Sequence, residues 1–109
     1  MNWLHLVSYA FGGAFLANAV PHVVSGLMGQ PFQTPFAKPP GRGLSSSTVN
    51  VLWGLFNIVI GYLLVCRVGD FELRNTSDVI ALGLGALAMS LFLARHFGSL
   101  HGGDLRERS

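Results

Sequence analysis

The residues of this sequence best suited to chemistry are one histidine and two asparagines that stand among apolar side chains. His22 lies deep within an uncharged run, and an ionisable residue inside an apolar helix is a functional candidate. Asn50 and Asn57 lie in a second uncharged run, and Gly54 and Gly61 continue their spacing. The offsets i, i+4, i+7 and i+11 span an arc of about 60° on a helix. They predict a polar, small-residue face that packs against another helix.

His22 has several candidate roles. Its imidazole, which burial should keep neutral, could relay a proton or bind a haem or metal ion. The structural alternative is donation to the carbonyl of Ala17, which Pro21 leaves without its helical partner. A single histidine is a poor metal site, and His5 lies near the other end of the same helix. We therefore expect no cofactor, and haem or metal at His22 would need His96 or a second copy of the chain.

Polar side chains from three apolar runs are expected to meet. At a rise of 1.5 Å per residue, Asn18, Asn57 and Ser90 fall at one depth. His22, Asn50 and Trp53 form a second layer, about 6–10 Å nearer the cytoplasm by the same rise. The polar seam is our name for Asn18, His22, Asn50, Trp53, Asn57 and Ser90. It could line a path or pocket for a small solute or ion, or simply join helices through hydrogen bonds of about 0.6 kcal/mol each.

The elements that must position the seam are three long apolar segments. Half of the residues (50%) are hydrophobic and 11% are charged, whereas soluble domains carry about a quarter charged residues. The fold class predicted is an all-α integral membrane protein, a single domain over residues 1–109, with the first helix kinked at Pro21. Transmembrane helices are expected at about 3–28, 48–66 and 79–97, joined by loops 29–47 and 67–78 and followed by a tail, 98–109. No Lys or Arg precedes the first helix, so we expect it to be retained and not cleaved as a signal peptide.

Small residues predict close helix packing. Gly54 and Gly61 supply it on the second helix, and Gly83, Ala86 and Ala94 recur with Ser90 on the third. Three helices of this length bury little of such faces among themselves. We therefore expect a homo-oligomer or a larger complex within the lipid bilayer.

The loop 29–47 contains four prolines, which exclude a regular helix. Phe32 and Phe36, in a repeated Pro-Phe pair, suit an interfacial anchor together with Lys38 and Arg42. Alternatively the loop is a lid over the seam, because long loops without regular structure are often functional. A phosphate or lipid headgroup at Gly41-Arg42-Gly43 is a third reading, although the spacing is not that of a P-loop.

Charge predicts orientation and excludes some partners. Five Lys or Arg residues lie on the side of the first loop and tail, and two lie on the other side, so the amino terminus is expected outside and the carboxyl terminus in the cytoplasm. A bacterial inner (plasma) membrane is the location expected. No basic stripe suggests nucleic acid as a partner. The cations counted are Lys38, Arg42, Arg95, Arg106 and Arg108 on one side and Arg67 and Arg74 on the other.

Three functions remain open from the sequence. The first is a homo-oligomeric channel or carrier that moves a small solute or ion through the polar seam. The second is an accessory or assembly subunit of a larger membrane complex. The third is a membrane enzyme or redox protein that depends on His22. No carboxylate lies within an apolar run and no catalytic triad is evident, so we do not expect an enzyme.

Overall fold

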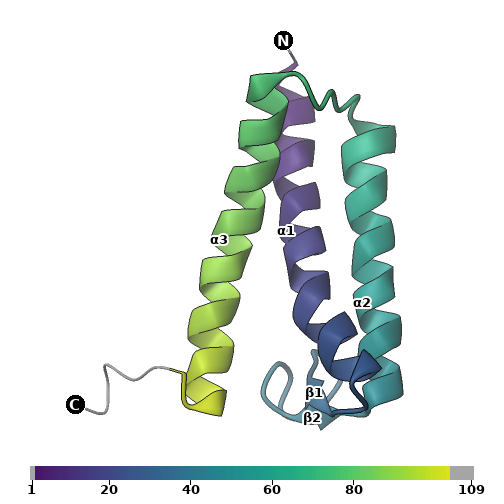
Figure 1. Ribbon diagram of the computed structural model, residues 1–109, viewed down its shortest axis with the longest axis vertical. Coiled ribbons are helices and arrows are strands. Elements are labelled where there is room, and N and C mark those ends of the chain that lie inside the picture. The colour runs from purple at the N-terminus through teal and green to yellow at the C-terminus, as the bar shows by residue number, and fades with distance from the viewer. Residues whose placement is uncertain (1, 104–109) are drawn as a thin grey trace, which may run out of the picture.

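The structure is a computed structural model that describes residues 2–103, and these are mostly helical. Three long rods stand side by side: α1 (Trp3–Leu27), α2 (Ser47–Tyr62) with its π-helical continuation η1 (Leu63–Val68), and α3 (Thr76–His101) (Figure 1). α1 packs against both of the others, whereas α2 and α3 make almost no contact with each other. The bundle is therefore a row with α1 in the middle.

The three predicted helices are confirmed, and each is long and apolar enough to cross a membrane by length and composition. Polar side chains fix where they start, because Asn2, Ser46 and Asn75 each accept a hydrogen bond from a backbone N–H of the first turn. The Asn75 cap explains why α3 begins at Thr76 and not at about 79. η1 carries the second rod to Val68, beyond the predicted end at 66.

The third helix is also longer than predicted at its carboxyl end. It continues through residues 98–101, which we had expected in the tail, and stops where Gly102 adopts a φ of 81°. The rest of the predicted tail, with Arg106 and Arg108, lies outside the described residues. Pro21 lies inside α1, and a kink there stays a prediction.

The Pro/Phe loop folds into a small cap at one end of the bundle (Figure 1). Two short antiparallel strands, β1 (Phe32–Gln33) and β2 (Leu44–Ser45), pair Phe32 with Ser45 and Gln33 with Leu44. The prolines lie before β1 or between the two strands, so their missing N–H groups remove no hydrogen bond from the strand pair. This strand pair was not predicted, and it fixes the loop beneath the helix ends.

Glycines set how closely the helices approach. A Cβ added at Gly54 would lie 3.2 Å from the carbonyl oxygen of Ala19, and one at Gly61 would lie 3.2 Å from that of Gly12. These two predicted packing positions therefore do face α1.

On α3 the packing glycine is Gly85, which the small-residue pattern of this helix also includes, and not Gly83. A Cβ at Gly85 would overlap the backbone of Ala10, whereas one at Gly83 would meet nothing within 4 Å. Ala86 also contacts α1, since its nitrogen would lie 3.0 Å from a Cβ at Gly13. The helix is thus rotated about its axis relative to the predicted face, and Gly83 has no packing role within a single chain.

Replacing each of these two glycines by alanine gives a matched test. Gly85→Ala should destabilise the fold by about 1–3 kcal/mol, because the backbones of α1 and α3 must separate. Gly83→Ala should be neutral or stabilising by up to about 1 kcal/mol, since alanine favours the helix. Denaturant unfolding of the detergent-solubilised protein measures both. Equal effects at the two positions would contradict the packing described here.

Candidate functional site

Four residues of the polar seam form two hydrogen-bonded pairs between α1 and α2. The Asn18 amide Nδ2 donates to Asn57 Oδ1 at 2.9 Å. One turn further along, His22 Nδ1 lies 2.7 Å from Asn50 Oδ1. Asn50 and Asn57 are both 0% exposed. The seam therefore joins the two helices inside one chain, as the structural reading of these asparagines expected.

Asn50 also holds the loop. The two hydrogens of its Nδ2 are shared among three backbone carbonyls, those of Phe32 at 3.1 Å, Ser45 at 3.2 Å and Ser46 at 3.0 Å. An amide nitrogen committed to carbonyls leaves the amide oxygen to face His22. His22 Nδ1 must then carry the hydrogen and donate, so the neutral imidazole has its lone pair on Nε2. His22 thus donates to Asn50 and not to the carbonyl of Ala17.

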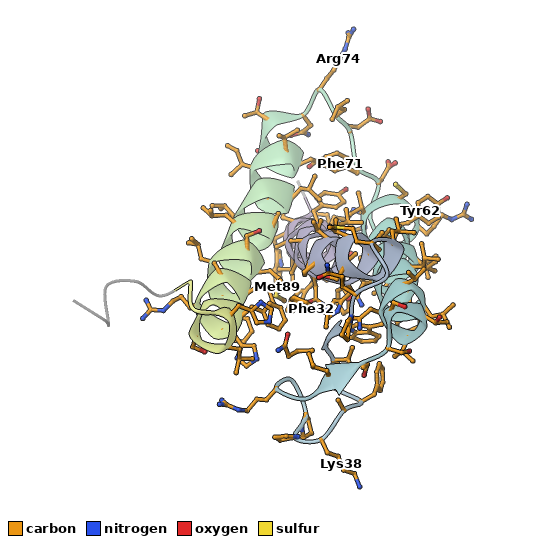
Figure 2. All side chains as sticks on the ribbon, turned by 60° about the horizontal axis from the view of Figure 1, so that its bottom comes forward. Phe32, Lys38, Tyr62, Phe71, Arg74 and Met89 are labelled. Atoms are coloured by element: carbon orange, nitrogen blue, oxygen red, sulfur yellow. The ribbon has the colours of Figure 1, made fainter. Side chains whose placement is uncertain are left out.

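A pocket of about 250 Å³ lies beside His22, between α1, α2, α3 and the loop. Seen from this end of the molecule, Phe32 lies among the helices while Lys38 projects away from them (Figure 2). Residues of the loop line one side of the pocket, and a lid role for the loop stays a prediction. Its lining residues are Asn18, His22, Gln33, Thr34, Pro35, Gly41, Trp53, Phe92, Leu93, His96 and Phe97.

Four side-chain polar atoms of the lining residues have no hydrogen-bond partner among residues 2–103 and are not fully buried. They are the acceptors His22 Nε2 and Asn18 Oδ1, the ring nitrogen His96 Nδ1 and the donor Gln33 Nε2, whose side chains bond only through their other polar atoms. Trp53 Nε1, a donor on another lining residue, is the one fully buried side-chain nitrogen or oxygen in this part of the chain that lacks a partner. The lining therefore offers a ligand both acceptors and a donor.

The histidines of α3 bind the loop and not His22. His96 Nε2 lies 2.6 Å from the carbonyl oxygen of Gly41, and His101 Nε2 lies 2.9 Å from Gln33 Oε1. Since both partners are acceptors, both nitrogens donate. His96 reaches the same pocket as His22, but within residues 2–103 no group of three or more His, Cys, Asp or Glu side chains could hold a metal ion.

Ser90 lies apart from the other seam residues. It is exposed and lines an apolar crevice of about 390 Å³ between α1 and α3, together with Pro21, Phe32 and Ala94. The rotation of α3 that brings Gly85 onto α1 turns Ser90 away from Asn18 and Asn57. Phe97 lines both this crevice and the polar pocket, so the two spaces adjoin.

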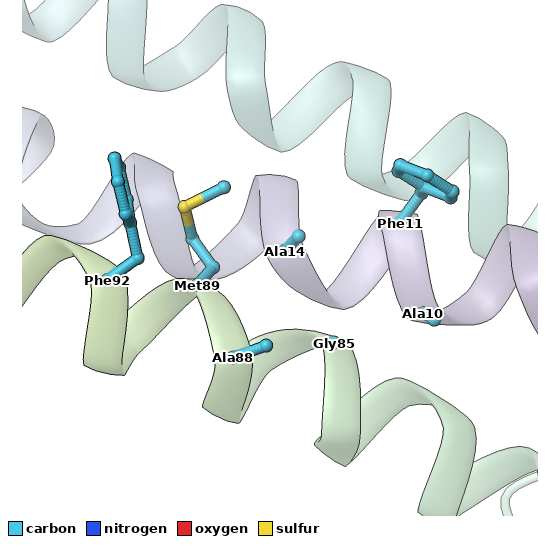
Figure 3. Close-up of a pocket in the computed structure, with 7 residues that line it drawn as sticks. All are labelled: Ala10, Phe11, Ala14, Gly85, Ala88, Met89 and Phe92. Atoms are coloured by element: carbon cyan, nitrogen blue, oxygen red, sulfur yellow. The ribbon is translucent and has the colours of Figure 1, made fainter.

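The crevice between α1 and α3 is followed by another apolar space toward the opposite end of the bundle. A further apolar pocket of about 340 Å³ lies between small residues of both helices and is bounded by larger side chains (Figure 3). Phe92 lines both this pocket and the polar one. The residues drawn in Figure 3 are Ala10, Phe11, Ala14, Gly85, Ala88, Met89 and Phe92.

Sequence reasoning missed the aromatic contribution of α3. Phe92 stacks on His96 at 6.0 Å between ring centroids, and Phe97 stacks on His101 at 6.2 Å. Each pair has the spacing i, i+4, which places both rings on one helix face. That repeated Phe/His spacing was the signal available. Gln33 and Thr34 carried no such signal, since the strand pairing places them.

Comparison with protein-family models, curated proteins and solved structures finds no match to this chain. Function is therefore argued from the site itself. Its chemistry is that of a small pocket with free hydrogen-bond acceptors, a free donor and aromatic walls, next to an apolar crevice.

The Asn18–Asn57 pair can be measured with a double-mutant cycle. Asn18→Ala, Asn57→Ala and the double variant should give a coupling free energy of about 1 kcal/mol, because either single change leaves a buried amide without its partner. Denaturant unfolding of the detergent-solubilised variants provides the four stabilities. Strict additivity would mean that the 2.9 Å contact contributes nothing to the fold.

Proposed function

We propose that the protein is an integral membrane carrier that binds a small solute in the polar pocket beside His22. The observation that carries the proposal is the set of free polar atoms, His22 Nε2, Asn18 Oδ1 and Gln33 Nε2, at a pocket where the neighbouring asparagines are already satisfied. Buried polar atoms normally have partners. Free acceptors and a free donor at one pocket favour a ligand that supplies the missing partners.

The membrane location is supported by the surface of the helices. Three apolar helices have the length to span a bilayer, and only 6% of the apolar window of α3 is buried within the chain. Large apolar side chains such as Leu84, Leu91 and Phe92 are more than half exposed. In water this surface would be unfavourable, whereas lipid accepts it.

A carrier fits the geometry better than an open channel. A water-filled path needs polar groups left free along its length. Here Asn57 and Asn50 are committed to protein partners and 0% exposed, so the free polar groups are those that line one pocket. We therefore place solute binding there and give the remaining seam a packing role.

Assembly with a second copy or a larger membrane partner is the second candidate function. α3 contacts α1 alone among the long helices, and Gly83 presents backbone with open space around it. Such a surface suits a neighbouring transmembrane helix. A homo-oligomeric carrier would satisfy both candidates.

Orientation can be tested with cysteines in a Cys66→Ser background. Leu73, 80% exposed in the loop before α3, should react with a membrane-impermeant maleimide in intact cells after Leu73→Cys. Ser99→Cys, at the end of α3, should react only after permeabilisation, because the loop 29–47 end carries more Lys and Arg and is placed in the cytoplasm. The reverse pattern would invert the proposed topology, and labelling of both sites in intact cells would contradict a spanning arrangement.

Solute binding can be tested by native mass spectrometry of protein extracted under mild conditions. The wild type should retain a non-protein mass at one per chain. Leu93→Trp should lose it, because Leu93 lines both the polar pocket and the crevice and a larger side chain fills them. Leu91→Trp is the matched control, since Leu91 is 58% exposed, and it should retain the mass. A bare wild-type chain, or equal retention by both variants, would overturn the proposal; the same spectra report the copy number.

A further inference from the structure

The free groups of the pocket define which hydrogen bonds its ligand must make. His22 Nε2 is an acceptor because Nδ1 carries the hydrogen that goes to Asn50. Asn18 Oδ1 is an acceptor because the amide nitrogen is donating to Asn57. Gln33 Nε2 is a free donor at the same pocket, since only the oxygen of that amide is bonded. The complementary ligand group both donates and accepts, as a hydroxyl does.

The charges around the pocket favour a neutral ligand. No Asp, Glu, Lys or Arg is among the lining residues. A charged ligand would therefore have no counter-charge among the lining side chains, and burying an unpaired charge is unfavourable. A neutral ligand is the class that fits.

The walls of the pocket favour a planar ring. Phe97 lies 6.3 Å from the ring of His22, measured between centroids, and 5.1 Å from that of His96. Trp53 faces His22 at 6.4 Å. Rings at these separations are in contact with one another and form one aromatic wall, against which a further ring can pack in edge-to-face or offset geometry. A sugar or simple alcohol would leave these apolar faces poorly covered.

The adjoining crevice accounts for an apolar tail. Leu93 and Phe97 line both spaces, so a molecule whose head occupies the polar pocket can extend between α1 and α3. The crevice is lined almost wholly by apolar side chains and lies on the side of the bundle that the proposed bilayer would cover.

We propose, on the basis of the membrane-carrier function above, that the ligand is an amphipathic phenol: a hydroxylated aromatic ring with an apolar tail. The ring hydroxyl donates to His22 Nε2 and the tail lies in the α1–α3 crevice. Reduced lipid quinones and simple alkylphenols share this chemistry.

A matched pair of probes tests the hydroxyl. 4-Nonylphenol and its methyl ether, 4-nonylanisole, have nearly the same shape, but only the phenol donates. The chain has two tryptophans, so Trp3→Phe leaves Trp53, at the pocket, as the sole tryptophan reporter. In this background the phenol should bind about five- to tenfold more tightly than the ether, the difference expected for one hydrogen bond. Trp53→Phe, which keeps only Trp3 at the far end of α1, should give no saturable signal with either probe.

His22→Asn separates the pocket acceptor from the structural contact. The asparagine amide nitrogen replaces Nδ1 and can still donate to Asn50, but nothing replaces Nε2. This variant should remain folded in thermal unfolding and lose the preference for the phenol, with both probes binding as weakly as the ether binds the wild type. A preference for the phenol that persists in His22→Asn would overturn the phenol proposal. Equal binding of the two probes to the protein that keeps His22 would do the same.

The outcomes also separate this proposal from the carrier function and identify the source of the phenol. A retained native mass without binding of 4-nonylphenol would leave the carrier proposal standing and reject the phenol. No retained mass and no probe binding would reject both. With binding established, decylhydroquinone bound more tightly than 4-nonylphenol would indicate a reduced lipid quinone, and equal or weaker binding would indicate a monophenol.

Discussion

The side-chain amide of Asn50 is the interaction on which the rest of this end of the molecule depends. It is 0% exposed and bonds three backbone carbonyls on one side and His22 on the other. Those contacts join α1, the start of α2 and both strands of the loop. They also fix the tautomer of His22, so that its Nε2 is an acceptor and not a donor. One residue therefore determines both the local architecture and the chemistry of the candidate site.

The helical framework could be predicted because its causes are local. Long apolar runs specify helices, and the i, i+4 and i, i+7 spacing of Asn50, Gly54 and Asn57 specifies a buried face, which the structure shows against α1. The pairing of Asn18 with Asn57 was also within reach, since the two fall at one depth when the rise per residue is counted along antiparallel helices.

The placement of α3 and of the loop could not be predicted in the same way. Gly83 and Gly85 are both small, and only the shape of α1 around Ala10 and Gly13 selects Gly85 as the contact. That choice turns Ser90 out of the seam. The loop residues Gln33 and Thr34 reach the pocket through the pairing of β1 with β2 and through contacts to His101 and Ser45. Such long-range pairings leave no periodic trace in the sequence.

The row arrangement of the helices leaves α3 supported from one side only. It is held to α1 by the close crossing at Gly85 and, at its other end, by the histidine bonds from His96 to Gly41 and from His101 to Gln33. The ring of Phe97 adds a contact to Phe32 at 4.6 Å between centroids. Since α2 hardly touches α3, the position of this end depends on α1 and on the folded loop. A change that unpairs β1 from β2 would therefore disturb the α3 wall of the pocket as well as its loop side.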